Sequence, residues 1–139
     1  MKKTGIFVLV LMLVIALSIG SYFYGSVRGK TLLAWQTITF PEDHSWASVQ
    51  QAMRVVKKDF RQNYEGCTLT RLWYDRELTE KTTVPTDADE IIVLSGNFRV
   101  GNYGPNVIPV FSPNSRYTGY SWTVCRYGNE WVITSRGYA

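Results

Sequence analysis

His44 is the only histidine in the chain, so any catalysis that relies on a histidine base has to use it. Near neutral pH an imidazole can accept a proton from water, or from a serine or cysteine nucleophile. His44 follows Asp43 directly and stands just before a segment with a helical pattern. A polar residue at a helix start needs no catalytic explanation. The sequence leaves both interpretations open.

A short acidic segment offers oxygen atoms that could bind a metal ion, with carboxylates at Asp87, Asp89 and Glu90. Calcium prefers clustered oxygens, but an EF-hand needs a glycine-centred loop of about 12 residues, and that spacing is absent. Zinc sites need closely paired ligands, whereas this chain has one histidine and two distant cysteines. We therefore predict no metal and no cofactor, and interpret the segment as a solvated turn.

The two cysteines, Cys67 and Cys125, are a candidate disulfide. An even number of cysteines in an oxidising compartment is compatible with a bridge. The alternative is a pair of buried thiols that pack as small apolar side chains. Because a bridge requires Cα atoms within about 4.4–6.8 Å, the sequence leaves the choice open.

The basic character of the chain comes from its N-terminal region. Four of the 15 Lys and Arg residues, Lys2, Lys3, Arg28 and Lys30, flank an uncharged run over residues 4–27. Without these four, residues 31–139 hold 11 basic and 11 acidic side chains. A nucleic-acid partner requires a basic surface on the folded domain, so we predict no nucleic acid among the partners.

The uncharged run predicts export of the chain. It is long enough to cross a hydrocarbon core of about 30 Å as a helix that rises ~1.5 Å per residue. The favoured expectation is a signal anchor over residues 1–27 that passes the cell membrane once through residues 5–25, with the C-terminal domain outside the cytoplasm. Tyr22 and Tyr24 support it, because aromatic side chains suit the headgroup level.

The alternative is a cleaved signal peptide and a secreted domain. Lys2 and Lys3 would be its basic region, and Ala16-Leu17-Ser18 would be its cleavage site. Residues 28–44 then form a linker with a short extended piece, and residues 45–139 form the exported domain.

A helix is predicted from Trp46 to Tyr64, because the apolar residues of this segment repeat at a helical period. Asp43 or Ser45 can accept a hydrogen bond from the first turn, and Gly66 suits the left-handed conformation at a helix end. Four basic residues share another side of the helix: Arg54, Lys57, Lys58 and Arg61. This side is either an ordinary solvated face or a surface that binds anionic headgroups or the anionic cell wall.

Strand-like segments make up the rest. Residues 68–74 and 91–100 are rich in residues that favour a pleated sheet. Residues 75–90 are expected to be a connection, and 101–119, with several Gly, Pro and Asn, a long loop. Gly128-Asn129 predicts a two-residue hairpin that joins 120–127 to 130–138.

These elements predict an α+β fold, with an N-terminal transmembrane or signal helix followed by one long helix packed on a curved antiparallel sheet. Their order resembles the cystatin-like or nuclear-transport-factor-two-like cone folds. Four segments look like an exported domain-of-unknown-function family of Gram-positive bacteria: Cys67-Thr-Leu-Thr-Arg-Leu-Trp-Tyr-Asp75, Glu90-Ile-Ile-Val-Leu94, Ser112-Pro-Asn-Ser-Arg-Tyr117 and Trp131-Val-Ile-Thr-Ser-Arg-Gly-Tyr138. That family supplies no catalytic residues to carry over.

The cone resemblance implies a mouth between helix and sheet that could hold a site. An enzyme there could use His44 or Asp75, with Arg99 or Tyr103 in support, although each also fits an ordinary loop or strand position. For ligand binding we single out three aromatic residues of the long loop: Tyr103, Phe111 and Tyr117.

Three functions follow as hypotheses. The leading one is a membrane-tethered, extracytoplasmic, non-enzymatic domain that binds a small ligand, a cell-wall component or a protein partner. The first alternative is an enzyme at the cone mouth, and the second is a structural or assembly subunit at the membrane.

Overall fold

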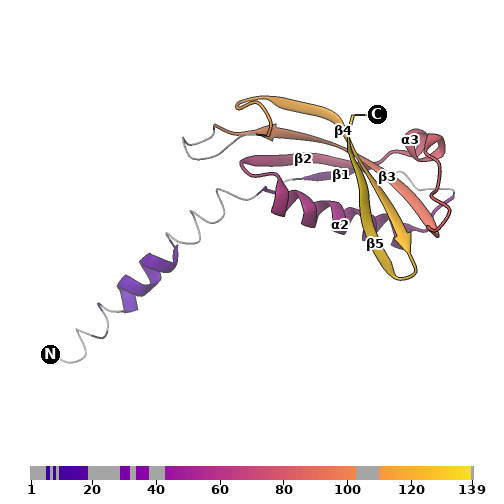
Figure 1. Ribbon diagram of the computed structural model, residues 1–139. Helices are drawn as coiled ribbons and strands as arrows, with labels where there is room; N and C mark the ends of the chain where they lie inside the picture. Colours follow the sequence, from indigo (N-terminus) through magenta and orange to yellow (C-terminus); the bar gives the residue numbers. More distant parts are fainter. Residues whose placement is uncertain are drawn as a thin grey trace.

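The protein is described by a computed structural model that covers residues 6, 8, 10–18, 29–31, 34–37, 43–102 and 110–138 (Figure 1). A short helical piece over residues 10–18 precedes the domain. The labelled elements are β1 (Trp35–Thr37), α2 (Trp46–Asn63), β2 (Cys67–Tyr74), α3 (Arg76–Lys81), β3 (Glu90–Val100), β4 (Arg116–Tyr127) and β5 (Glu130–Gly137).

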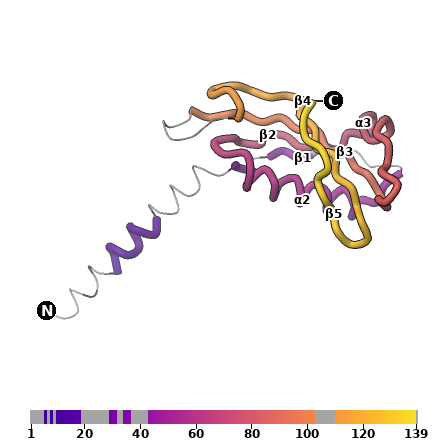
Figure 2. The backbone as a smooth tube through the Cα atoms, in the orientation of Figure 1, coloured from indigo at the N-terminus to yellow at the C-terminus, as the bar shows by residue number. Residues whose placement is uncertain are grey.

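The strands lie side by side in their sequence order, from β1 to β5. β2 to β5 form an antiparallel meander, and β1 joins its edge parallel to β2, with Trp35 beside Arg71. A bulge bends a strand and increases its twist. This sheet has three such irregularities, which account for the curved strands in Figure 2. They fall at Leu69/Arg71, Gly96/Phe98 and Thr123/Val124.

α2 lies across one face of the sheet, as predicted from its apolar stripe (Figure 1). The side chain of Ser45 accepts a hydrogen bond from the Ser48 amide and caps the helix. Gly66 has a φ of 68°, the left-handed conformation expected just after the helix. The helix buries Val49, Ala52, Met53, Val56 and Phe60 against the inner faces of β2, β3 and β4.

The hairpin predicted at Gly128-Asn129 is confirmed. Tyr127 pairs with Glu130, Arg126 with Trp131, and Val124 with Ile133. A two-residue loop fixes this register, because it leaves no freedom in which residues face each other. Trp122 and Val124 consequently point into the core, and Trp131 and Ile133 pack against it.

The predicted fold class is wrong in two respects, although the domain is α+β. The sheet is mixed and not antiparallel, because the extended piece before α2 pairs parallel with β2. The prediction of a long apolar N-terminal helix is also wrong: none of the described helices has the length and apolarity to span a membrane.

Part of the predicted connection 75–90 is a helix. Asp75 caps α3 by accepting a hydrogen bond from the Leu78 amide at 3.0 Å. Thr79 on this helix bonds the backbone of Val93, so α3 covers the start of β3 on the face away from α2. We call that face the outer face.

Candidate functional site

Aromatic rings pack together at the end of the domain where we expected a ligand pocket. Phe111 stacks on Tyr64 and Tyr117 stacks on Phe98, with ring centroids 5.6 and 5.0 Å apart. Phe111 and Tyr117 are 5.0 Å from each other. The structure thus brings two of the three predicted ligand-binding residues together, as rings packed against the core. Tyr103, the third, lies outside the described residues.

Polar groups within this aromatic cluster are hydrogen-bonded to one another. The indole nitrogen of Trp122 donates to the Tyr64 hydroxyl at 3.0 Å. Burial, reinforced by a hydrogen bond to Tyr120, raises the pKa of Tyr64, so its hydroxyl stays neutral. Arg136 of β5 donates to the buried carboxylate of Asp59 on α2, at 3.0 Å from Nε. These contacts stabilise the packing of α2 on β4 and β5.

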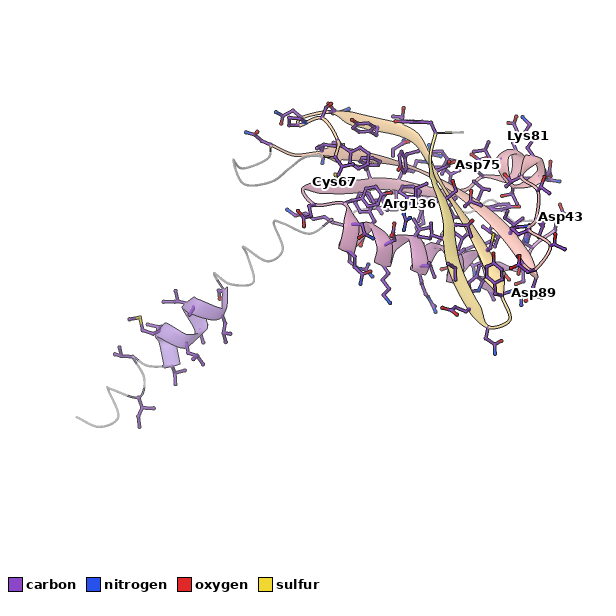
Figure 3. The ribbon with its side chains drawn as sticks, viewed as in Figure 1. Asp43, Cys67, Asp75, Lys81, Asp89 and Arg136 are labelled. Atoms are coloured by element: carbon purple, nitrogen blue, oxygen red, sulfur yellow. The ribbon has the colours of Figure 1, made fainter. Side chains whose placement is uncertain are left out.

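His44 lies at the opposite end, beside a pocket of about 460 Å³. Its Nδ1 is 2.7 Å from Oε1 of Glu90, and the two side chains are only 15% and 14% exposed. The other oxygen of Glu90 accepts hydrogen bonds from Ser48 at 3.0 Å and from Nε of Arg126 at 3.1 Å. Asp43 and Asp89, at the same end in Figure 3, line the pocket as well.

The carboxyl group of Glu90 is held in its charged form. Burial raises its pKa, but the hydrogen bonds from His44, Arg126 and Ser48 together outweigh burial, and the net pKa is lowered. A charged Glu90 accepts the Nδ1 proton of His44, which leaves Nε2 as the acceptor in the neutral ring. His44 thus borders a pocket and has a second titratable group, Glu90, within hydrogen-bond reach, as a histidine base requires.

Both carboxylate oxygens of Asp75 accept hydrogen bonds within the fold. One of its oxygens caps α3, and the other accepts a hydrogen bond from Ser95 at 2.7 Å. The bond from Ser95 ties the start of α3 to β3. Asp75 is therefore a structural residue of the α3 corner.

The candidate disulfide is not formed, because Cys67 and Cys125 are buried free thiols. Cys67 pairs with Val100 at one end of β3, and Cys125 pairs with Ile91 near the other. The nine residue steps from Ile91 to Val100 extend over about 30 Å, far beyond the reach of a bridge.

Basic side chains form a row across the outer face at the far end of β3. Lys30 pairs with Thr68, Thr68 with Arg99, and Arg99 with Arg116. Residues that pair across a sheet point to the same face. All three basic residues are exposed, and among the described residues no carboxylate forms an ion pair with them. We call Lys30, Thr68, Arg99 and Arg116 the basic row.

Two depressions adjoin Arg99 and Arg116, and both arginines line each of them. One has a volume of about 360 Å³ and includes Thr68, Asn114 and Ser115. The other has about 330 Å³ and includes Thr70, Asn97 and Thr118. Hydroxyl and amide groups thus lie on both sides of the two guanidinium groups.

Sequence reasoning named Arg99 as a supporting residue at the cone mouth but missed its pairing with Arg116. Residues 116–119 were assigned to a loop, and they belong to β4. The irregularity between Gly96 and Phe98 then sets the register that places Arg99 opposite Arg116. The alternation of exposed Arg99 with apolar Phe98 and Val100 was the one available signal.

The described residues define an α+β domain with a five-stranded mixed sheet and a basic row on its outer face. Among them, no group of three or more His, Cys, Asp or Glu side chains is placed to hold a metal ion. No family model, curated protein or solved structure matches the chain.

Proposed function

We propose that the chain is a non-enzymatic binding domain for an anionic ligand, and that it acts outside the cytoplasm. The observation that carries this proposal is the pair formed by Arg99 and Arg116, directly opposite each other across β3 and β4. Like charges in this arrangement destabilise a sheet. A bound anion removes that repulsion and gains two guanidinium partners.

The chemistry of the surroundings supports the same ligand class. Arginine presents a planar fork of donors that matches the oxygens of phosphate and carboxylate groups. Lys30 extends the positive charge along the basic row, and Thr68 lies between Lys30 and Arg99 as an additional donor. Of the partners expected from the sequence, an anionic cell-wall component or small anion fits best. The export pattern of residues 1–27 supports the location.

Calorimetric titration of the full chain with polyphosphate at low ionic strength tests the proposal. Arg99→Gln and Arg116→Gln are each expected to weaken binding about tenfold, the loss of roughly one charge-assisted hydrogen bond. Arg54→Gln is the matched control, because it removes an equal charge from an exposed site on α2. If all three variants weaken binding equally, the basic row is not the site.

One observation favours an enzyme as a second candidate: His44, oriented by Glu90, borders a 460 Å³ pocket. In this function Nε2 of His44 removes a proton from the water that attacks an ester carbonyl. The test is hydrolysis of a panel of p-nitrophenyl esters, with loss of activity in His44→Gln and retention in Glu80→Gln, which changes another side chain of the same pocket. Equal rates for wild type and His44→Gln would eliminate this candidate.

A further inference from the structure

We infer that the anionic ligand is a chain of polyol units linked by phosphodiesters, bound across both depressions with a phosphate between Arg99 and Arg116. This inference rests on the proposed function and specifies its ligand. The two arginines line both depressions, so a group bound to them has a depression on either side. The lining of the first is mainly polar, and that of the second combines Thr70, Asn97 and Thr118 with Phe98 and Tyr117.

The two depressions follow the strands. Thr68 and Arg99 are paired, and Asn97 lies two residues before Arg99 on β3, on the same face. Two residues of a strand extend about 7 Å. Arg99 and Asn97 are therefore about 7 Å apart along β3. One small polyol phosphate unit has about this length.

The lining of the depressions selects among anions. A phosphodiester carries its negative charge on the central phosphate, where the two guanidinium groups lie. The flanking polyol units present hydroxyl groups, which match Ser115 and Asn114 on one side and Thr118 on the other. A free phosphate ion would occupy only the centre. A lipid surface would meet the charges but would not enter two separate depressions.

Three probes separate these cases in calorimetric titrations of the full chain: glycerol 3-phosphate, a synthetic trimer of glycerol phosphate, and polyphosphate of similar charge. We expect the trimer to bind at least about tenfold more tightly than glycerol 3-phosphate, because it reaches both depressions. We also expect it to bind more tightly than polyphosphate, which has no hydroxyl-bearing units. Vesicles with 30% phosphatidylglycerol are the membrane probe.

Two variants remove hydroxyl groups and leave the charges unchanged. Ser115→Ala and Thr118→Val each remove one hydroxyl, the first from one depression and the second from the other. Each is expected to weaken trimer binding about 2- to 10-fold, the range for one hydrogen bond, and to leave polyphosphate binding unchanged. Urea unfolding of each variant checks that the sheet is intact.

The results distinguish failure of this inference from failure of the proposed function. Equal affinities for glycerol 3-phosphate and the trimer would overturn the chain ligand while the anion site stands. Binding to the vesicles with no binding to the trimer would also overturn it, in favour of a lipid surface. If none of the probes binds, including polyphosphate, the proposed function itself fails.

Discussion

The pairing of Arg99 with Arg116 predicts that removing either charge stabilises the unliganded protein. Side chains directly opposite in an antiparallel pair have Cβ atoms about 4.5–5.5 Å apart, and two arginine heads can separate to about 7 Å. At that distance in water, two unit charges repel each other by about 0.6 kcal/mol. Arg116→Gln should therefore raise the free energy of unfolding by about this amount, or the melting temperature by about 2–5 °C for a domain of this size.

Urea unfolding of wild type, Arg99→Gln, Arg116→Gln and the double variant gives the measurement, because urea leaves the ionic strength unchanged. The double-mutant cycle isolates the interaction of the two charges from the effect of each substitution alone. In about 1 M NaCl the screening length is ~3 Å, so the coupling should fall below about 0.2 kcal/mol. Added polyphosphate should reverse the order and make wild type the most stable of the four.

Two results would refute this reasoning. A coupling that favours the charged pair would mean that the two guanidinium groups do not repel each other. A stabilisation that persists unchanged in high salt would assign the effect to packing or strand propensity. Arg54→Gln, which removes an exposed charge from α2, shows how much of any change comes from net charge alone.

Three further predictions concern the contacts that hold the domain together. The lowered pKa of Glu90 stabilises the fold above its ordinary value of 4.5, and this effect is lost as the pH falls through the folded-state pKa. Glu90→Gln should therefore be destabilised at pH 7 in urea unfolding, and its difference from wild type should shrink as the pH falls below 4.5; a constant difference would exclude this linkage. Tyr64→Phe should lower the free energy of unfolding by about 1–3 kcal/mol in the same assay. The reason is that the indole N–H of fully buried Trp122 loses its acceptor. An unchanged midpoint would show that this hydrogen bond contributes nothing. Asp59→Asn should cost about 1.5–3 kcal/mol in the same assay, because it removes the charge that Arg136 pairs with. The buried carboxylate, 8% exposed, should keep most of this effect in 0.5 M NaCl, and its complete loss in salt would contradict a contribution from the ion pair.

Local signals allowed much of the fold to be predicted. The apolar stripe of α2 and the Gly128-Asn129 turn depend on residues close in sequence, and both the helix and the hairpin register follow from them. α3 was missed because its six residues are too few for a helical period to show, so the Asp75 cap had no pattern to confirm it. The parallel pairing of β1 depends on how the chain returns to the sheet after α2, which no local pattern specifies.

The sites were harder to predict because their contacts are distant in sequence. His44 and Glu90 are 46 residues apart, and nothing in either segment indicates the other. Arg99 and Arg116 required the register of two long strands across an irregularity. The aromatic loop residues were recognised by type, but their stacking on Tyr64 and Phe98 joins segments far apart in the sequence, which no local pattern specifies.

In a chain held at its N-terminus, the way the N-terminal segment joins the sheet would limit how far the domain can move. β1 is three residues long and lies at an edge, and the Lys30 bridge extends the same contact. Tension on the N-terminus would load these few bonds first and leave the β2–β5 meander intact. Release of residues 29–45 would free a segment that reaches about 55–60 Å when fully extended. It would also take Lys30 out of the basic row. The domain would then move farther from its N-terminus, with one basic group fewer in the row.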